Sequence, residues 1–323
     1  MDKLNCGASC MSGIVAAASL VSAFMLSSAV AAPAANDEEA QAREAWREVI
    51  VRTDVPEGAC FHASYPRTEW VKVECGVAPK VPFTPRTGTS SRTVGNGVDF
   101  VAETSALSIR SVGTFLQKRI TSVTGPLGAN DYSIQLNSNF MTKAACNGVP
   151  GCQTWEQFVY SSGYESAFMQ YWLIDYGASC PGGWTAYGSS CYMNSAAVSV
   201  PSQPITELNY LKLSGKAVAG GLDTLIFTTE TDAYSTTGED SVLDLATAWY
   251  QTEVNVVGDG LGAKAVFNLG TIIKVIIATR DGSSNAPTCV LDAGTTGETN
   301  NLGLRGCKTR GGTVPDISYI ESN

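Results

Sequence analysis

The chain has 323 residues with 30 acidic and 21 basic side chains, which give a formal net charge of −9. This length is enough for a full hydrophobic core, and the acidic balance disfavours nucleic acid and anionic lipid as partners. The only histidine is His62, and no EF-hand spacing is present, so we expect no metal, no cofactor and no histidine-based catalytic site.

The first 31 residues are typical of a secretory signal peptide. Lys3 supplies a positive charge, residues 14–30 are apolar and uncharged, and the small residues Ala29 and Ala31 fit a cleavage site after Ala31. The alternative is an uncleaved anchor, because about 18 apolar residues can just span a bilayer. We expect a secreted protein, extracellular or periplasmic, that does not contact the membrane after cleavage.

Eight cysteines follow the predicted signal peptide. An even number in an exported chain indicates disulfides, because an oxidising compartment keeps them formed. A zinc site is disfavoured because no CxxC pair exists. The connectivity is not fixed by the sequence, but the grouping along the chain predicts four local loops: Cys60–Cys75, Cys146–Cys152, Cys180–Cys191 and Cys289–Cys307.

Residues 32–93 differ in character from the rest of the chain. Residues 37–52 are rich in helix formers, with acids first and arginines later, which predicts a solvated helix with a narrow apolar stripe. The small cysteine loop follows, and then a linker rich in proline, glycine and serine. We place a domain boundary near Thr93, and we expect residues 32–93 to be separable, as a propeptide would be.

Residues 94–323 read as many short strands with almost no helical signal. The β-branched and aromatic runs are separated by Gly, Asn, Asp or Pro. This pattern predicts an all-β domain, and a two-sheet antiparallel β-sandwich of the lectin-like (concanavalin-like) jelly-roll type fits its length best. The expected strands are 98–102, 132–136, 155–160, 168–174, 208–213, 224–228, 247–257, 265–269 and 272–277.

Two of these strands carry polar side chains in alternation. In residues 153–160, Trp155, Gln157 and Val159 share one face and Glu156 takes the other. In residues 248–256, the shared face holds a row that would suit a polar ligand groove: Trp249, Gln251, Glu253 and Asn255. The competing interpretation is an ordinary solvent-facing strand. The aromatic strand 168–176 could line such a groove or fill the core.

The order of these pieces resembles the glutamic peptidases called eqolisins, which are secreted lectin-like β-sandwiches made with a propeptide. The resemblance rests on Cys152-Gln153-Thr154 before Gln157, on Gln170-Tyr171-Trp172, and on Thr252-Glu253-Val254. Val94-Gly95-Asn96-Gly97 looks like the start of the mature family domain. The chain has valine at 254 and 257, where the family carries a tryptophan and a second acid. Neprosin peptidases are a looser match.

The resemblance implies hydrolysis of peptide bonds at acid pH. Glu253 would act as general base and then general acid, and Gln157 would hold the water and donate to the oxyanion. The substrate would contact the remaining polar and aromatic side chains of the groove: Trp155, Gln170, Trp172, Trp249, Gln251 and Asn255.

Two other functions remain open at this stage. A non-catalytic lectin-like module would use the same aromatic and amide side chains to bind carbohydrate. A glycosidase would need Glu253 paired with a second acid such as Glu156. Because Glu156 and Gln157 alternate, only one of them can share a face with Glu253. The expected ligand is an extracellular peptide or polysaccharide.

Overall fold

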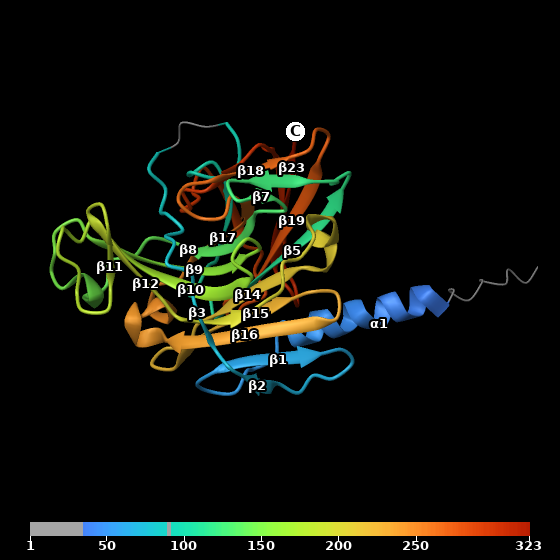
Figure 1. The fold of residues 1–323 in the computed structure, drawn as a ribbon, viewed down its shortest axis with the longest axis horizontal. Helices are drawn as coiled ribbons and strands as arrows, with labels where there is room; N and C mark the ends of the chain where they lie inside the picture. The colour runs from blue at the N-terminus through green and yellow to red at the C-terminus, as the bar shows by residue number, and fades with distance from the viewer. Residues whose placement is uncertain (1–34, 89–91) are drawn as a thin grey trace, which may run out of the picture.

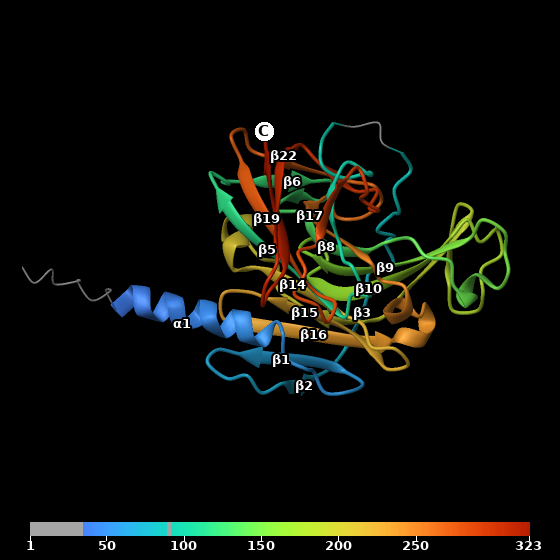
Figure 2. The same cartoon turned by 180° about the vertical axis from the view of Figure 1, so that it is seen from behind.

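Alternating apolar residues build the strands of this protein. In β19 (Ile272–Arg280), for example, every second residue from Ile273 to Thr279 is buried, and Ile273, Val275 and Ile277 are fully buried. The computed structural model describes residues 35–88 and 92–323; the predicted signal peptide, residues 1–31, lies outside the described residues. Two large antiparallel sheets pack face to face, which confirms the expected all-β sandwich (Figures 1 and 2).

One sheet has nine strands. Its order is β2 (Val71–Val73), β1 (Cys60–Ser64), β16 (Asp232–Glu239), β15 (Leu222–Thr228), β14 (Lys212–Lys216), β5 (Arg110–Lys118), β19, β23 (Asp316–Ser322) and β22 (Gly303–Arg310).

The other large sheet has ten strands. Its main order is β11 (Thr185–Tyr187), β12 (Ser190–Asn194), β10 (Ser166–Ile174), β9 (Gln153–Ser161), β8 (Ser133–Ser138), β17 (Gln251–Val257), β4 (Phe100–Glu103) and β20 (Thr288–Leu291). Two further strands join it beside β10: β13 (Ala196–Ser199) and β3 (Gly76–Val77).

Smaller elements complete the described chain. A four-stranded sheet contains β21 (Thr299–Asn300), β18 (Lys264–Phe267), β6 (Val123–Gly125) and β7 (Gly128–Ala129). Four 3-10 helices are η1 (Ala144–Cys146), η2 (Ile205–Tyr210), η3 (Asp240–Val242) and η4 (Leu245–Thr247). The α-helix α1 spans Ala35–Ile50, close to the helix expected at 37–52. Among the described residues, no helix is long and apolar enough to cross a membrane.

The main core lies between the two large sheets. Phe158 of β9 stacks on Trp249 at a centroid distance of 6.0 Å, and Tyr160 stacks on Phe227 at 4.1 Å. The sheets approach closely where glycines replace side chains, because a Cβ on Gly215 would lie 2.7 Å from the Phe158 ring. The inward face of the ten-stranded sheet is therefore the face of Phe158, and the face of Gln157 points away from the core.

Residues 35–88 are part of the sandwich framework. β1 pairs with β16, and β3 pairs with β13. Helix α1 packs Trp46 and Ile50 against Ala63 and Ala233. The buried Lys212 ammonium binds the carboxylates of two helix residues, Glu44 at 2.8 Å and Glu48 at 2.5 Å. Removal of residues 32–93 stays a prediction. Such removal would have to break these contacts.

The disulfide prediction is confirmed at all four positions. Cys60–Cys75, Cys146–Cys152, Cys180–Cys191 and Cys289–Cys307 are bonded in the local pairs expected from their spacing. Cys60 places its disulfide on β1, so this bond fixes the leading segment to its own hairpin. Disulfides fit a non-cytoplasmic compartment, because the cytosol keeps thiols reduced.

Two expected strands differ from the structure. The strand predicted at 247–257 starts only at Gln251, because η4 and the left-handed Asp244 (φ 52°) shape the preceding residues. The strand predicted at 208–213 is half 3-10 helix, since η2 follows Pro204 and β14 begins at Lys212. The first difference moves Trp249 out of the alternation on which its predicted groove position depended.

Gly215→Ala should destabilise the protein by about 1–3 kcal/mol, because the new methyl group would overlap the Phe158 ring in a packed core. Urea unfolding of both proteins measures this difference. Gly182→Ala is the matched control, since a Cβ there would meet no atom within 4 Å. Equal losses in the two variants would contradict the close approach of the sheets at Gly215.

Candidate functional site

The outer face of the ten-stranded sheet carries a row of polar side chains. In the strand register, Gln157 of β9 lies opposite Asn137 of β8, and Asn137 lies opposite Glu253 of β17. Gln157 and Glu253 therefore share a face and a row, as expected. They are not on neighbouring strands, because β8 lies between them and separates their backbones by roughly 10 Å.

The Gln157 amide is held in one orientation by two side chains. Its Nε2 donates to Gln135 Oε1 at 3.2 Å, and its Oε1 accepts from the Trp172 indole N–H at 3.2 Å. Gln157 is fully buried. Because Trp172 can only donate, it fixes which end of the amide is the oxygen.

The Glu253 carboxylate is surrounded by donors. Its Oε1 accepts from Asn255 Nδ2 at 2.6 Å. Its Oε2 accepts from the Thr295 N–H at 2.5 Å, the Thr295 hydroxyl at 2.9 Å and the Thr296 N–H at 3.2 Å. The side chain is 1% exposed. Both carboxylate oxygens therefore have hydrogen-bond donors.

A second acid lies close to Glu253. Asp99 accepts from Asn255 Nδ2 at 2.8 Å, so the same amide group bridges it to Glu253. Burial raises the pKa of Asp99 well above its usual 3.8, and the charge of Glu253 raises it further. Burial thus favours the protonated form of Asp99.

Most predicted substrate-binding residues join this face, and one does not. Trp155, Gln170 and Trp172 lie on it, and Trp172 donates to Gln170 Oε1 at 3.0 Å. Trp249 lies in the core between the sheets, so its predicted groove position is not observed. The two remaining predicted residues are Asn255, beside Glu253, and Gln251, which binds Glu103 at 2.6 Å near the end of the row.

Residues 79–86 cross this face; we call them the covering segment. Gln170 binds its backbone twice, accepting from the Phe83 N–H at 2.7 Å and donating to the Val81 carbonyl at 3.0 Å. Asn194 Nδ2 donates to the Pro79 carbonyl at 2.9 Å. The segment runs upward from β3 past the strands of the ten-stranded sheet (Figures 1 and 2).

A loop at residues 294–298 closes the other end of the face. Thr295 accepts from the Arg86 N–H at 2.8 Å, and Gly297 donates its N–H to the Thr84 carbonyl at 2.7 Å. Glu298 accepts from the Thr84 N–H at 2.8 Å. The loop thus binds the covering segment on one side and Glu253 on the other. Together they bury the whole polar row.

Glu156 takes the opposite face, as alternation requires. It lies in the core near Asp223, Asp240 and Tyr171. The carboxyl groups of Glu156 and Asp223 interact with each other, and no other side chain among the described residues donates to their oxygens. A glycosidase pair of Glu156 with Glu253 is excluded, because the sheet itself separates the two carboxyl groups.

Burial raises the pKa values of this inner cluster. The pKa of Glu156 is well above its usual 4.5, first from burial and then from the Asp223 charge. The pKa of Asp223 is about 8, raised by burial and then by Asp240. The described part of the chain contains no group of His, Cys, Asp and Glu that could hold a metal ion. Burial thus favours the protonated forms of Glu156 and Asp223.

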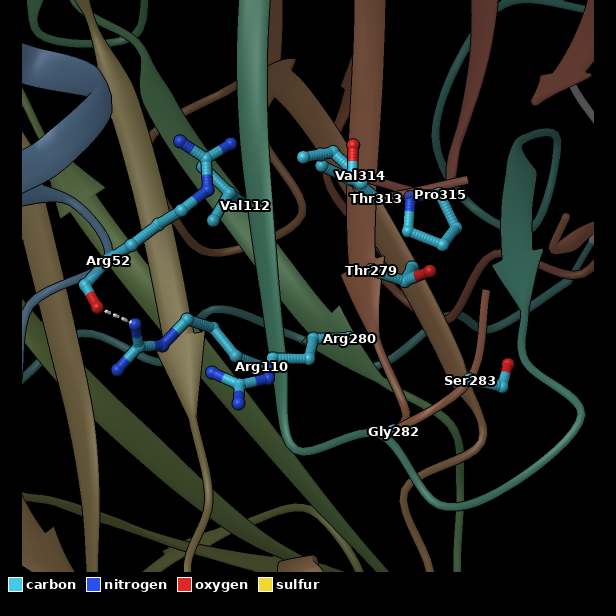
Figure 3. Close-up of a pocket in the computed structure, with 11 residues that line it drawn as sticks. Arg52, Arg110, Val112, Thr279, Arg280, Gly282, Ser283, Thr313, Val314 and Pro315 are labelled. Carbon is cyan, nitrogen blue, oxygen red and sulfur yellow. Dashed lines mark hydrogen bonds between the residues drawn. The ribbon is translucent and has the colours of Figure 1, made fainter. Parts of the chain in front are cut away.

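A separate cavity of about 450 Å³ lies on the outer side of the nine-stranded sheet (Figure 3). Arg52, Arg110 and Arg280 line it. Arg110 donates to the Arg52 carbonyl, and burial, with the nearby Arg280 charge, lowers the pKa of Arg110. The lining residues include three arginines and no carboxylate, so the cavity suits an anion.

Sequence reasoning missed Gln135 and Asn137 of β8. Gln135 Oε1 accepts from Gln157, Asn137 and the Thr296 hydroxyl, so it connects both halves of the row. The signal was present, because Ser133, Gln135 and Asn137 alternate with Ile134 and Leu136. The same polar alternation identified the face of β17.

Comparison with known protein families finds no family model that matches the chain. Comparison with curated proteins finds no similar sequence either.

Stability should fall between about pH 4 and pH 8. Asp223 has a folded pKa of about 8 against a usual 3.8, so its contribution is complete below pH 4 and is lost as the pH rises through 8. Asp223→Asn should therefore raise the melting temperature at pH 8 and reduce the difference between pH 5 and pH 8, with effects on the order of a few kcal/mol.

Melting curves from pH 5 to pH 8 test this dependence, in a range where surface carboxylates are already ionised. The exposed Asp292 provides the control variant Asp292→Asn. A wild-type melting temperature that rises towards pH 8, or equal behaviour of the two variants, would show that the inner cluster is not protonated.

Proposed function

We propose that this protein is an exported hydrolase that cleaves peptide bonds at acid pH, with Glu253 as general base and acid and Gln157 as the group that positions water. One observation carries the proposal: the face that holds both residues binds an extended polypeptide, its own residues 79–86, through backbone contacts from Gln170. A site built this way suits a peptide better than a sugar.

The row offers a place for the reacting water. Asn137 lies between Gln157 and Glu253, and its buried Oδ1 has no hydrogen-bond partner among the described residues. Buried acceptors need donors, and a water bound there would lie between the two predicted catalytic groups. Glu253 would take a proton from this water, and the water oxygen would attack the carbonyl carbon of the substrate.

Gln157 Nε2 would then donate to the developing oxyanion, as a side-chain amide does in other acyl-transfer sites. Glu253 would return the proton to the leaving nitrogen as the C–N bond breaks, so that one water is consumed and no other reactant is needed. For substrate to enter, the covering segment must leave, and the 294–298 loop must release at least one oxygen of Glu253.

Export completes the proposal. The four disulfides support a non-cytoplasmic location, and the predicted signal peptide would direct the chain there. In this scheme, residues 32–93 act as a propeptide whose last part covers the site until it is displaced or cleaved. The resemblance to eqolisins likewise predicts a propeptide before residue 94.

A second candidate function is a binding module without catalysis. The observation that favours it is the saturation of Glu253, whose two oxygens together accept four hydrogen bonds. A carboxylate held in this way can serve to anchor a loop. The ligand of such a module would occupy the same face, either as peptide or, in the lectin-like reading, as polysaccharide.

Glu253→Gln should reduce acid proteolysis by about 10²-fold or more, because glutamine keeps the shape of the side chain and cannot transfer the proton. The assay incubates the purified full chain with a denatured protein substrate from pH 2 to pH 8. It also follows the N-terminus of the chain itself, which reports removal of the covering segment. Glu165→Gln, at an exposed position, is the control.

An unchanged rate in Glu253→Gln would exclude the assigned catalytic role. Absence of proteolysis by the parent protein at every pH, including after residues 79–86 have been removed, would favour the binding module.

A further inference from the structure

The covering segment reveals what kind of polypeptide the polar face accepts. We infer that the face contains an apolar subsite for a large, preferably aromatic side chain, and that Phe83 is its internal occupant. This inference rests on the proposed function for its ligand class, an extended polypeptide. It adds a specificity-determining pocket made by β9, β10 and β13.

Backbone recognition at the face does not depend on ligand sequence. Gln170 donates to one carbonyl and accepts from the N–H two residues later, as a neighbouring β-strand would. Asn194 and Glu298 extend this pattern towards either end of the segment, at Pro79 and Thr84. Any extended chain without a proline at the position of Phe83 could make the contacts with Gln170.

Selectivity must therefore come from side chains, and Phe83 is the best candidate. Its side chain is fully buried, and its ring meets Phe168 edge to face at a centroid distance of 5.7 Å. Val159 and Ala197 complete the wall on the sheet side. This apolar cluster is separate from the main core, so it exists only because the covering segment lies on the face.

The pocket has a defined position relative to Glu253. Phe83 is bound through Gln170 of β10, whereas Arg86, three residues later, is bound through Thr295, which itself donates to Glu253. A ligand running in the same direction would place its aromatic side chain on the β10 side of the row. The peptide bond of the ligand that lies over Glu253 would then be a few residues C-terminal to this aromatic side chain.

The neighbouring side chains make this pocket selective for size. Gln170 and Trp172 are fixed by their mutual hydrogen bond, so the floor beside the pocket cannot rearrange freely. Small side chains would leave a void against Phe168 and Val159, and charged side chains would be buried without a partner. Complete burial of a phenylalanine side chain corresponds to an affinity gain of about 10- to 100-fold over alanine.

The test uses a fluorescent peptide with the sequence of residues 79–87 and a second peptide with alanine in place of its phenylalanine. Binding to full-length Phe83→Ala protein is measured by fluorescence anisotropy. In this variant the internal segment is weakened, so we expect the phenylalanine peptide to bind at least about 10-fold more tightly than the alanine peptide. The wild-type protein should bind both peptides more weakly, because its own Phe83 occupies the pocket.

Two further variants keep the test decisive. Phe83→Leu retains an apolar side chain, so it serves if Phe83→Ala does not fold, with the same order of peptide affinities expected. Adding Gln170→Leu to either variant should weaken both peptides by a similar factor, since it removes the backbone contacts that they share.

Equal affinity of the two peptides for a folded Phe83 variant would overturn the aromatic subsite. The proposed hydrolysis has a separate readout. Selective binding without cleavage of any substrate would refute the hydrolase and leave the subsite intact. Acid proteolysis together with equal binding of the two peptides would support the hydrolase and refute the aromatic subsite.

Discussion

Burial of a polar sheet face is the constraint on which this structure depends. Gln135, Gln157 and Glu253 are almost completely shielded from water, and each buried donor or acceptor left unpaired costs about 1–3 kcal/mol. The 294–298 loop supplies donors to Glu253 and Gln135, and the covering segment supplies a backbone donor and a backbone acceptor to Gln170 on the same face. Residues 35–88, which contain the covering segment, are anchored to the sandwich by the pairing of β1 with β16 and by the packing of α1.

The alternation of β9 gives two adjacent residues opposite electrostatic environments. Gln157 faces amides, an indole and the Glu253 row, whereas Glu156 faces the core and other acids. Glu253 accepts four hydrogen bonds from the residues around it, whereas burial favours the neutral form of Glu156. A neutral amide beside an ionised carboxylate can hold and activate water, while paired acids in a core can only share protons. The chemistry of the two faces therefore differs although their residues are neighbours in sequence.

Local patterns in the sequence predicted most of what is local in the structure. The four disulfides close short loops, and β9, β10 and β19 are rich in β-branched and aromatic residues, so both were accessible to pattern reasoning. β5 and β16 were missed because glycine, serine and threonine interrupt their apolar alternation. Trp249 was assigned to the wrong side because a 3-10 turn precedes β17. Residues 79–86 read as a linker, since nothing local encodes a contact with Gln170, which lies 87 positions from Phe83 in the chain.

The contacts of Glu253 are linked to the covering segment through the 294–298 loop. The donors to Glu253 Oε2 all belong to Thr295 and Thr296, and these residues bind the covering segment as well, through the Thr295 carbonyl and the bridge between Thr296 and Pro85. Loss of the segment would remove the loop's contacts with Thr84, Pro85 and Arg86. The hydrogen bonds that saturate Glu253 are thus coupled to occupancy of the face. In the proposed mechanism, the same carboxylate would anchor the loop while the segment is bound and would become available for proton transfer once the segment has left.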